Sequence, residues 1–365
     1  MGVDERIRDQ LDRLATERDA QHLFEGVARI RRRRATVRSV GTSALAVVVI
    51  AGTAAGFLLL SRTFGDDRAG VHPGAGLPAN GLIAYSDINT DTGDGDIFVI
   101  REDGSGLTVL HQPGDDYDPH WSPDGTRLYF VKAGEGIFVM NADGSVQQRI
   151  SNTGTSSVAV SPDGSTIAYE GSAPITRDTS GGEVIAVDEN GDQVMPSIWL
   201  MDADGADPRP LAGTEGSSGM GASWSPDGTQ LTFGNRNGVW IVDADGSHPH
   251  QVVADGDIPI WSPDGARILF VRDHDVMSVA PDGSGLISIA HGAHTFYRDI
   301  AFAPDGSRVL VTAAPDADGP QNYEILSMEL DGDQVRQVTN LGGDDEGWCC
   351  LSPSWQPAPN PGTQR

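Results

Sequence analysis

A run of oxygen-bearing side chains between residues 86 and 96 is the stretch of this sequence best suited to metal chemistry. The segment DINTDTGDGD places carboxylate and amide oxygens at Asp87, Asn89, Asp91, Asp94 and Asp96. Ca²⁺ takes about six to eight oxygen ligands, and alternating acidic and amide residues can supply them. The match to an EF-hand loop is partial, because Gly93 comes one place late and no Glu closes the loop. The segment predicts a calcium loop, with a solvated polar loop as the alternative.

Two adjacent cysteines, Cys349 and Cys350, are the only cysteines in the chain. Outside the cell they can be oxidised, and neighbouring cysteines can form a strained disulfide ring. We predict a vicinal disulfide; buried free thiols, pairing between molecules and a redox switch are the alternatives. Their spacing does not fit a zinc site or thioredoxin chemistry.

No familiar catalytic motif accompanies these residues. The nine His form no H-E-x-x-H pair, and neither a G-x-S-x-G nucleophile elbow nor a phosphate loop occurs. We expect the protein not to be an enzyme. The sequence indicates no cofactor other than calcium, which is a candidate. A metal-dependent lyase or hydrolase is the minor alternative.

The elements that must position these residues are repeated. WSPDG occurs three times, ending at Gly125, Gly228 and Gly265, and looser copies end at Gly164 and Gly306. Pro sets φ for the second turn position, Asp bonds to the local backbone, and Gly accepts a positive φ. Each copy precedes a short apolar, β-branched run, such as RLYFVK from Arg127. The pentapeptide therefore predicts a tight turn between two strands.

A second motif completes each period: a strand that runs into an Asp-Gly turn, as in IFVMNADG and VWIVDADG, followed by a short closing strand. Four strands in roughly 40 residues suit one blade of a β-propeller. Six closing strands predict six blades. The first blade lacks its inner strand, and SPSWQP, residues 352–357, is an inner strand with nothing after it. We expect the two chain ends to share one blade and close the ring.

These motifs resemble the TolB-like propeller repeat, a relative of the WD repeat, from Gly81 to Pro357. The resemblance implies an all-β, six-bladed propeller. It does not imply the TolB role, because TolB has an additional N-terminal domain. Trp121, Trp224, Trp261 and Trp355 share one repeat position. We predict that they pack between blades, with ligand stacking as the minor alternative.

Residues 40–60 form an uncharged stretch of 21 residues, long enough for one transmembrane helix. Six arginines lie between residues 29 and 38, so the N-terminus is expected in the cytoplasm and the propeller outside the cell. A cleaved signal peptide is the alternative. The domain prediction is a cytoplasmic, amphipathic, Arg-rich helical segment (1–39), a transmembrane helix (40–60), a flexible linker (61–80), the propeller (81–357) and a disordered tail (358–365).

The charge is divided along the same line. Residues 1–39 hold ten Arg and seven Asp or Glu, a net charge of +3. Because the whole chain has a net charge of −27, residues 40–365 carry −30. Such an acidic ectodomain excludes nucleic acid as a partner. It favours cations or basic partners, although solubility alone also explains it. A single Lys against 24 Arg suggests a GC-rich, actinobacterial genome.

The propeller topology predicts where ligands bind. The SPDG and Asp-Gly turns share one side of the ring, the turn face, and the irregular connections share the other side. The irregular connections are residues 86–96, 171–197, 213–221, 291–298, 313–323 and 340–351. Two acidic clusters are expected on this irregular face, around the channel mouth, where cations or a basic peptide would bind: Asp115, Asp116 and Asp118, and Asp344, Asp345 and Glu346.

Three functions remain open on the sequence alone. The leading hypothesis is a membrane-anchored, extracytoplasmic module that binds a protein, peptide or glycan on the irregular face. The second is a transmembrane sensor whose N-terminal helix engages a cytosolic regulator such as a sigma factor or a kinase. The alternative for this helix is that it only rests on anionic lipid at the membrane surface. The third is the metal-dependent enzyme.

Overall fold

The structure of the propeller region is a computed structural model. The described residues are 80–88, 94–110, 113–152, 157–171, 176–178, 185–187, 197–215, 221–235, 237–291, 296–314, 323–339 and 352–358. The predicted N-terminal helix, transmembrane helix, linker and most of the tail lie outside these ranges. Within them, no helix has the length and apolar character needed to cross a membrane.

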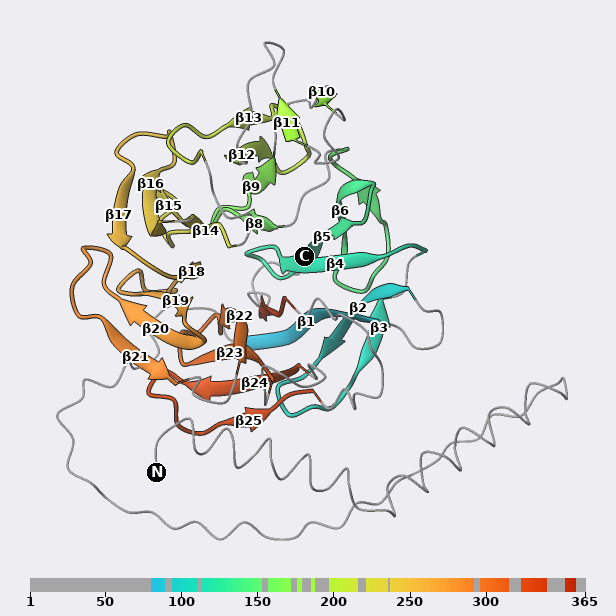
Figure 1. The fold of residues 1–365 in the computed structure, drawn as a ribbon. Helices are drawn as coiled ribbons and strands as arrows, with labels where there is room; N and C mark the ends of the chain where they lie inside the picture. Colours follow the sequence, from blue (N-terminus) through green and yellow to red (C-terminus); the bar gives the residue numbers. More distant parts are fainter. Residues whose placement is uncertain are drawn as a thin grey trace, which may run out of the picture. The chain divides into compact units, whose positions relative to one another are not determined.

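Six antiparallel four-stranded sheets form the six blades of a propeller (Figure 1). Blade 1 contains β26 (Ser354–Pro357), β1 (Asn80–Ile88), β2 (Gly95–Ile100) and β3 (Thr108–Leu110). Blade 2 contains β4 (Asp116–Trp121), β5 (Arg127–Lys132), β6 (Gly136–Asn141) and β7 (Gln148–Arg149). Blade 3 contains β8 (Val158–Val160), β9 (Thr166–Gly171), β12 (Ser197–Asp202) and β13 (Arg209–Pro210).

The other three blades follow in chain order. Blade 4 contains β14 (Ser223–Trp224), β15 (Gln230–Asn235), β16 (Gly238–Asp243) and β17 (His250–Val253). Blade 5 contains β18 (Asp257–Trp261), β19 (Ile268–Arg272), β20 (Asp275–Val279) and β21 (Ile287–Ala290). Blade 6 contains β22 (Phe296–Phe302), β23 (Arg308–Ala314), β24 (Glu324–Glu329) and β25 (Arg336–Gln337). A separate hairpin, β10 (Thr176–Asp178) and β11 (Ile185–Val187), lies between β9 and β12 in the sequence.

The ring closes through strands from the two ends of the propeller. β26 pairs with β1 in antiparallel register, with Ile83 opposite Trp355 and Ala84 opposite Ser354. This confirms the predicted six-bladed, all-β architecture and its closure by a C-terminal strand. Every blade consequently has a neighbour on both sides.

The SPDG turns have the geometry that their residues predict. In the first turn, the Gly125 amide donates to the Ser122 carbonyl at 2.8 Å, and Gly125 has a φ of 68°. Asp124 accepts hydrogen bonds from the Ser122 hydroxyl at 2.6 Å and the Thr126 amide at 3.0 Å. The Ser122 hydroxyl in turn accepts from the Arg127 amide at 2.9 Å. Each such Asp therefore fixes its own turn, which accounts for part of the acidic composition.

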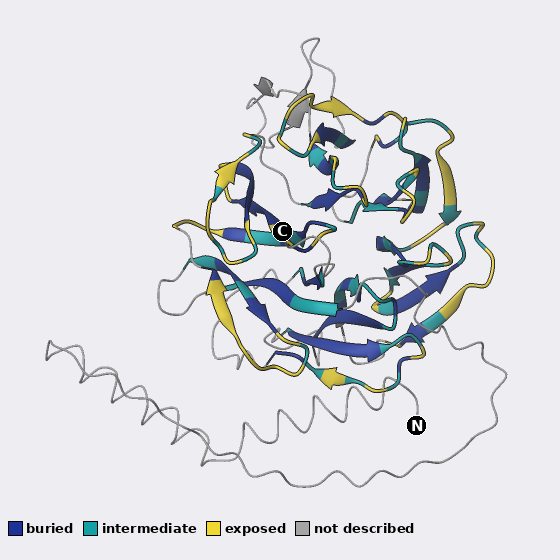
Figure 2. Cartoon of the chain, turned by 180° about the vertical axis from the view of Figure 1, so that it is seen from behind, coloured by how far each residue is buried: buried dark blue, intermediate teal, exposed yellow. Residues whose placement is uncertain are grey.

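The hydrophobic core lies between blades. Figure 2 shows buried inner and middle strands, with exposed residues concentrated on the outer strands. Trp121 of blade 2, for example, is 3% exposed and packs in one cluster with Ile97 and Val99 of blade 1. Trp261 and Trp355 are likewise buried in clusters that join neighbouring blades. The predicted packing role is therefore confirmed for these three tryptophans.

We predict that Trp355→Ala lowers the free energy of unfolding by about 3–5 kcal/mol, as other buried Trp→Ala changes do. Trp355 is 5% exposed and contributes to the cluster shared by blades 6 and 1. Urea denaturation followed by circular dichroism measures the change. Val146→Ala, at a position 76% exposed with a φ of 56°, is the control and should not lower the midpoint. A loss below about 1 kcal/mol for Trp355→Ala would contradict the proposed role of this side chain.

Candidate binding site

The predicted calcium loop is only partly within the described residues. Asp87 of β1 lies opposite Asp96 of β2, and Asp96 is fully buried. Asp94 directly precedes β2, whereas Asn89 and Asp91 lie outside the described ranges. Within those ranges, no three His, Cys, Asp or Glu residues are grouped as a metal site requires. The calcium site stays a prediction.

The three acidic residues Asp115, Asp116 and Asp118 each contact a different partner. Asp115 accepts a hydrogen bond from the Gly95 amide of blade 1 at 2.9 Å. Asp116 pairs with the buried Lys132 ammonium at 2.6 Å, and Lys132 also donates to the Pro113 carbonyl at 2.8 Å. These contacts hold the start of β4 in place. Asp344, Asp345, Glu346, Cys349 and Cys350 lie outside the described residues, so their predicted roles remain untested.

Asp118 and Asp299 form a pair at the inner strands. Each lies where a bulge interrupts the inner strand of its blade, β4 or β22, and Asp118 has a φ of 54°. Asp118 accepts from the Val158 amide of blade 3 at 2.9 Å and bonds to the Ser352 side chain. Asp299 accepts from the Ser352 backbone amide. Ser352, just before β26, is thus held by both carboxyl groups.

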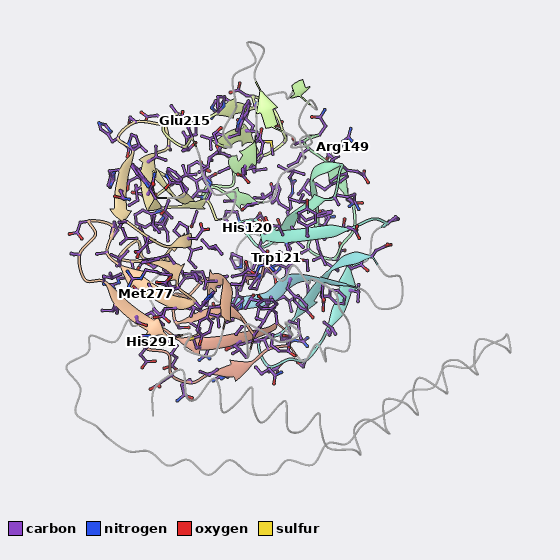
Figure 3. The ribbon with its side chains drawn as sticks, in the orientation of Figure 1. His120, Trp121, Arg149, Glu215, Met277 and His291 are labelled. Carbon is purple, nitrogen blue, oxygen red and sulfur yellow. The ribbon has the colours of Figure 1, made fainter. Side chains whose placement is uncertain are left out.

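Burial changes the pKa values of these inner groups. Burial, with a smaller contribution from the charge of Asp299, raises the pKa of Asp118 from 3.8 to about 7. Burial also raises the pKa of Asp299, and it lowers the pKa of His120 from 6.5 to about 4. All three side chains keep some accessible surface, although protein atoms surround them on most sides. Figure 3 places His120 near the centre of the ring.

A carboxyl group that titrates near neutrality has the properties of a general acid or base. The Asp118 contacts, however, join strands of three blades, and those of Asp299 join blade 6 to Ser352. We therefore assign the pair to holding the inner strands around the closing segment. Neither Asp299 nor His120 was expected from the sequence, since neither belongs to an acidic cluster or a motif.

Asp118 and His120 should act on stability in opposite directions. Between pH about 4 and 7, folded Asp118 holds a proton that the unfolded chain has released, so its contribution to the free energy of unfolding falls as pH rises. Between pH 6.5 and about 4, unfolded His120 binds a proton that the folded protein does not, so its contribution falls as pH falls.

We predict that Asp118→Asn steepens the loss of stability on acidification, whereas His120→Gln reduces it. Urea midpoints of both variants and the parent, measured from pH 4.5 to 7.5, provide the test. Asn keeps a carbonyl oxygen that can accept the Val158 hydrogen bond, so the change removes mainly the titration. Parallel pH profiles for all three proteins would contradict the assignment.

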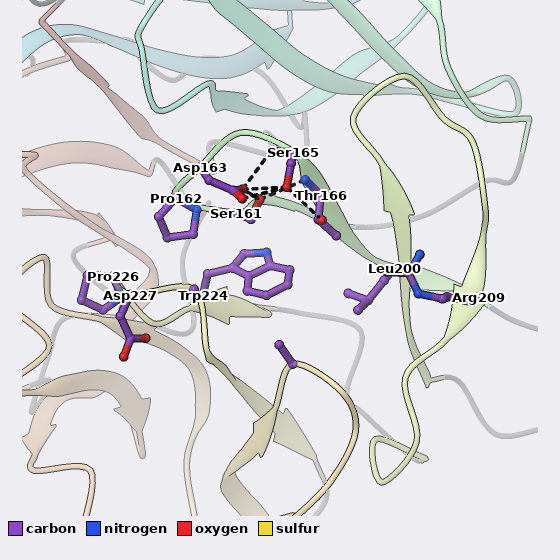
Figure 4. A pocket seen from close by; sticks show the side chains of 12 residues that line it. Ser161, Pro162, Asp163, Ser165, Thr166, Leu200, Arg209, Trp224, Pro226 and Asp227 are labelled. Carbon is purple, nitrogen blue, oxygen red and sulfur yellow. Dashed lines mark hydrogen bonds between the residues drawn. The ribbon is translucent and has the colours of Figure 1, made fainter.

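A groove of about 470 Å³ opens on the turn face between blades 3 and 4 (Figure 4). Its apolar lining includes Leu200, Trp224, Ala244 and two turn prolines, Pro162 and Pro226. The polar lining consists of Ser161, Asp163, Ser165, Thr166, Arg209, Asp227 and Gly228. Figure 4 shows the Trp224 indole between the turn that carries Asp163 and the turn that carries Asp227.

Trp224 differs from its equivalents because it is only partly buried. Its indole nitrogen donates to the Ala159 carbonyl of β8 at 3.2 Å, which fixes the plane of the ring. Trp224 packs against blade 3. In the SPDG turn of that blade, the Ser161 amide donates to the carbonyl of Thr166. The corresponding residues of blades 2, 4, 5 and 6 are Arg127, Gln230, Arg267 and Arg308. Thr166 lines the groove together with Trp224, and we attribute the groove to the shorter side chain at this position.

The carboxylates of the groove are fixed and charged. Hydrogen bonds from Ser161 and Ser165 lower the pKa of Asp163, and those from Ser225 and Thr229 lower the pKa of Asp227. Arg209, the cation of this lining, lies 3.1 Å from the exposed Asp207 carboxylate. The groove therefore combines an immobilised aromatic surface with a net negative charge.

The sequence analysis placed ligand binding on the opposite, irregular face. Most connections of that face lie outside the described residues, so this prediction remains open. The groove was missed because the turns that form it were interpreted as regular structural elements. Its signal in the sequence is the short Thr166 in the blade that precedes Trp224.

The fold is that of a TolB-type six-bladed β-propeller. TolB from Acinetobacter baumannii matches with a TM-score of 0.58 and 17% identity, over 77% of this chain and 68% of that one. A putative TolB from Agrobacterium tumefaciens matches with a TM-score of 0.52 and 21% identity, over 71% and 88%. A chain of a nidogen/laminin complex matches with 0.53 and 12%, over 75% and 98%. No protein-family model matches the sequence, and no curated protein matches it.

Proposed function

We propose that this protein is a binding propeller for a protein or peptide ligand. One observation carries the proposal: the groove between blades 3 and 4 presents a partly exposed Trp224, whereas Trp121, Trp261 and Trp355 are buried. An aromatic ring fixed by a hydrogen bond loses little conformational entropy when a ligand covers it. The likeness to TolB structures supports the fold, and the proposed ligand class is our inference from the groove.

An enzymatic role has less support within the described residues. The nearest approach to a catalytic triad there is Ser288, His291 and Asp275. The Asp275 carboxylate lies 2.8 Å from Nδ1 of His291, and the Ser288 hydroxyl lies 3.5 Å from the same nitrogen. A triad needs the serine and the carboxylate on different ring nitrogens. This group therefore lacks the geometry for nucleophilic catalysis.

We predict that a photoreactive residue in the groove captures the ligand in cells. Benzoylphenylalanine at position 226 of the full chain should give one discrete cross-linked protein upon irradiation, because Pro226 lines the groove. The same probe at position 146, on the exposed Asp-Gly turn of blade 2, is the control. Adding Trp224→Ser should abolish the product. Equal products at both positions, or a product that survives Trp224→Ser, would contradict the proposal.

The membrane location is part of the same proposal. The uncharged residues 40–60 would anchor the propeller outside the cell, and the Arg-rich segment before them would remain inside. A sensor that engages a cytosolic regulator through residues 1–39 is the alternative form of this architecture. Both forms display the groove to ligands outside the cell.

We predict that the full chain sediments with membranes and resists extraction at high salt and alkaline pH, because a spanning helix is held by the hydrophobic effect. Deletion of residues 40–60 should release it. External protease should cleave the linker at residues 61–80 and leave an N-terminal epitope tag protected. Release of the intact chain by salt, or cleavage of the tag, would contradict this topology.

A further inference from the structure

We propose that the groove between blades 3 and 4 takes a basic, extended segment of a partner protein, with an Arg or Lys side chain stacked on Trp224 between Asp163 and Asp227. The inference rests on the proposed function, since it specifies the chemistry of the ligand at that site. It places an acidic recognition surface on the turn face, whereas the sequence predicts one on the irregular face.

The first argument is the disposition of the two carboxylates. Oδ1 of Asp227 accepts from the Ser225 hydroxyl at 2.7 Å, the Thr229 amide at 3.0 Å and the Thr229 hydroxyl at 2.8 Å. Among the contacts of the described residues, none is made to Oδ2 of Asp227. The turn therefore holds the carboxylate still with one oxygen available to a ligand. Asp163 is held by equivalent bonds to Oδ1 in the neighbouring blade, and its Oδ2 also accepts from the Ser165 hydroxyl at 2.9 Å.

The second argument is charge complementarity. Asp163 and Asp227 give the lining two negative charges, and Arg209 gives it one positive charge. Arg209 is already engaged by Asp207, both through the carboxylate at 3.1 Å and through the backbone carbonyl at 3.1 Å. With a formal net charge of −27, the whole chain attracts cations over distance. A basic ligand is thus attracted both at long range and on contact.

The third argument is the shape and composition of the lining. The indole face of Trp224 can stack with a guanidinium or ammonium group. The apolar walls, Pro162, Pro226 and Leu200, suit the aliphatic stem of the same side chain. A groove of about 470 Å³ accommodates a few residues of an extended chain and not a folded domain.

Fluorescence anisotropy with defined peptides tests the inference on the purified full chain. The probe is a labelled nonapeptide of alternating Gly and Arg, compared with peptides that carry Gln or Glu in place of Arg. We expect saturable binding of the Arg peptide only, with an affinity that falls as salt is raised. Asp163→Asn combined with Asp227→Asn should weaken binding at least about fivefold, since each contact is a partly exposed ion pair.

Matched variants separate the groove from the general acidity of the protein. Asp124→Asn combined with Asp264→Asn removes two equivalent turn carboxylates outside the groove and should leave the affinity unchanged. Asn can still accept the turn hydrogen bonds, and melting curves verify that each variant is folded. Trp224→Leu should abolish binding, whereas Trp224→Phe should retain part of it.

Each other outcome has a defined meaning. Equal weakening by both Asn pairs, or no binding of the Arg peptide, overturns the inference. If the Gln peptide binds and this binding depends on Trp224, the claim that the ligand is basic is overturned, but the proposed function stands. Trp224-dependent binding of a labelled oligosaccharide panel makes the groove a glycan site and overturns both. Binding of the Glu peptide alone reverses the assigned charge preference and also overturns the inference.

Discussion

The pairing of β26 with β1 is the interaction on which the rest of the structure depends. It joins residues 274 apart in sequence: the Leu82 amide donates to the Gln356 side chain at 3.1 Å, and the Trp355 indole donates to the Gly81 carbonyl at 3.3 Å. Without it, blade 1 would lack its inner strand and two blades would expose unpaired surfaces. Because the core lies between blades, closure is what buries it.

Polar contacts strengthen the closure on both sides of blade 1. Toward blade 2, Gln356 donates to the Gly125 carbonyl at 2.7 Å, and Ser354 accepts from the Trp121 amide at 3.3 Å. Toward blade 6, Glu102 lies 2.7 Å from the buried Arg308 guanidinium. Asp118 and Asp299 add a third set of contacts at Ser352, at the cost of burying two carboxyl groups. A ring fixed in this way holds neighbouring blades at constant spacing, which a groove between blades requires.

The sequence predicts what local chemistry determines. The SPDG motif specifies a turn within six residues, so its hydrogen bonds and the number of blades could be read directly, as could the closure by residues 352–357. The groove depends instead on contacts between blades, where Thr166 of one blade meets Trp224 of the next. The partly buried Asp118 and Asp299 pair likewise depends on how two distant inner strands meet at Ser352. Such relationships appear only once the ring is assembled.

Amide hydrogen exchange in the full chain tests the closure most directly. β26 is compared with β4, another inner strand, and with the exposed outer strand β7. Our account predicts that peptides covering β26 and β1 exchange as slowly as those covering β4, since all three open only when the ring opens. Exchange of β26 as fast as that of β7 would show that the ends are not locked together, and would contradict the account.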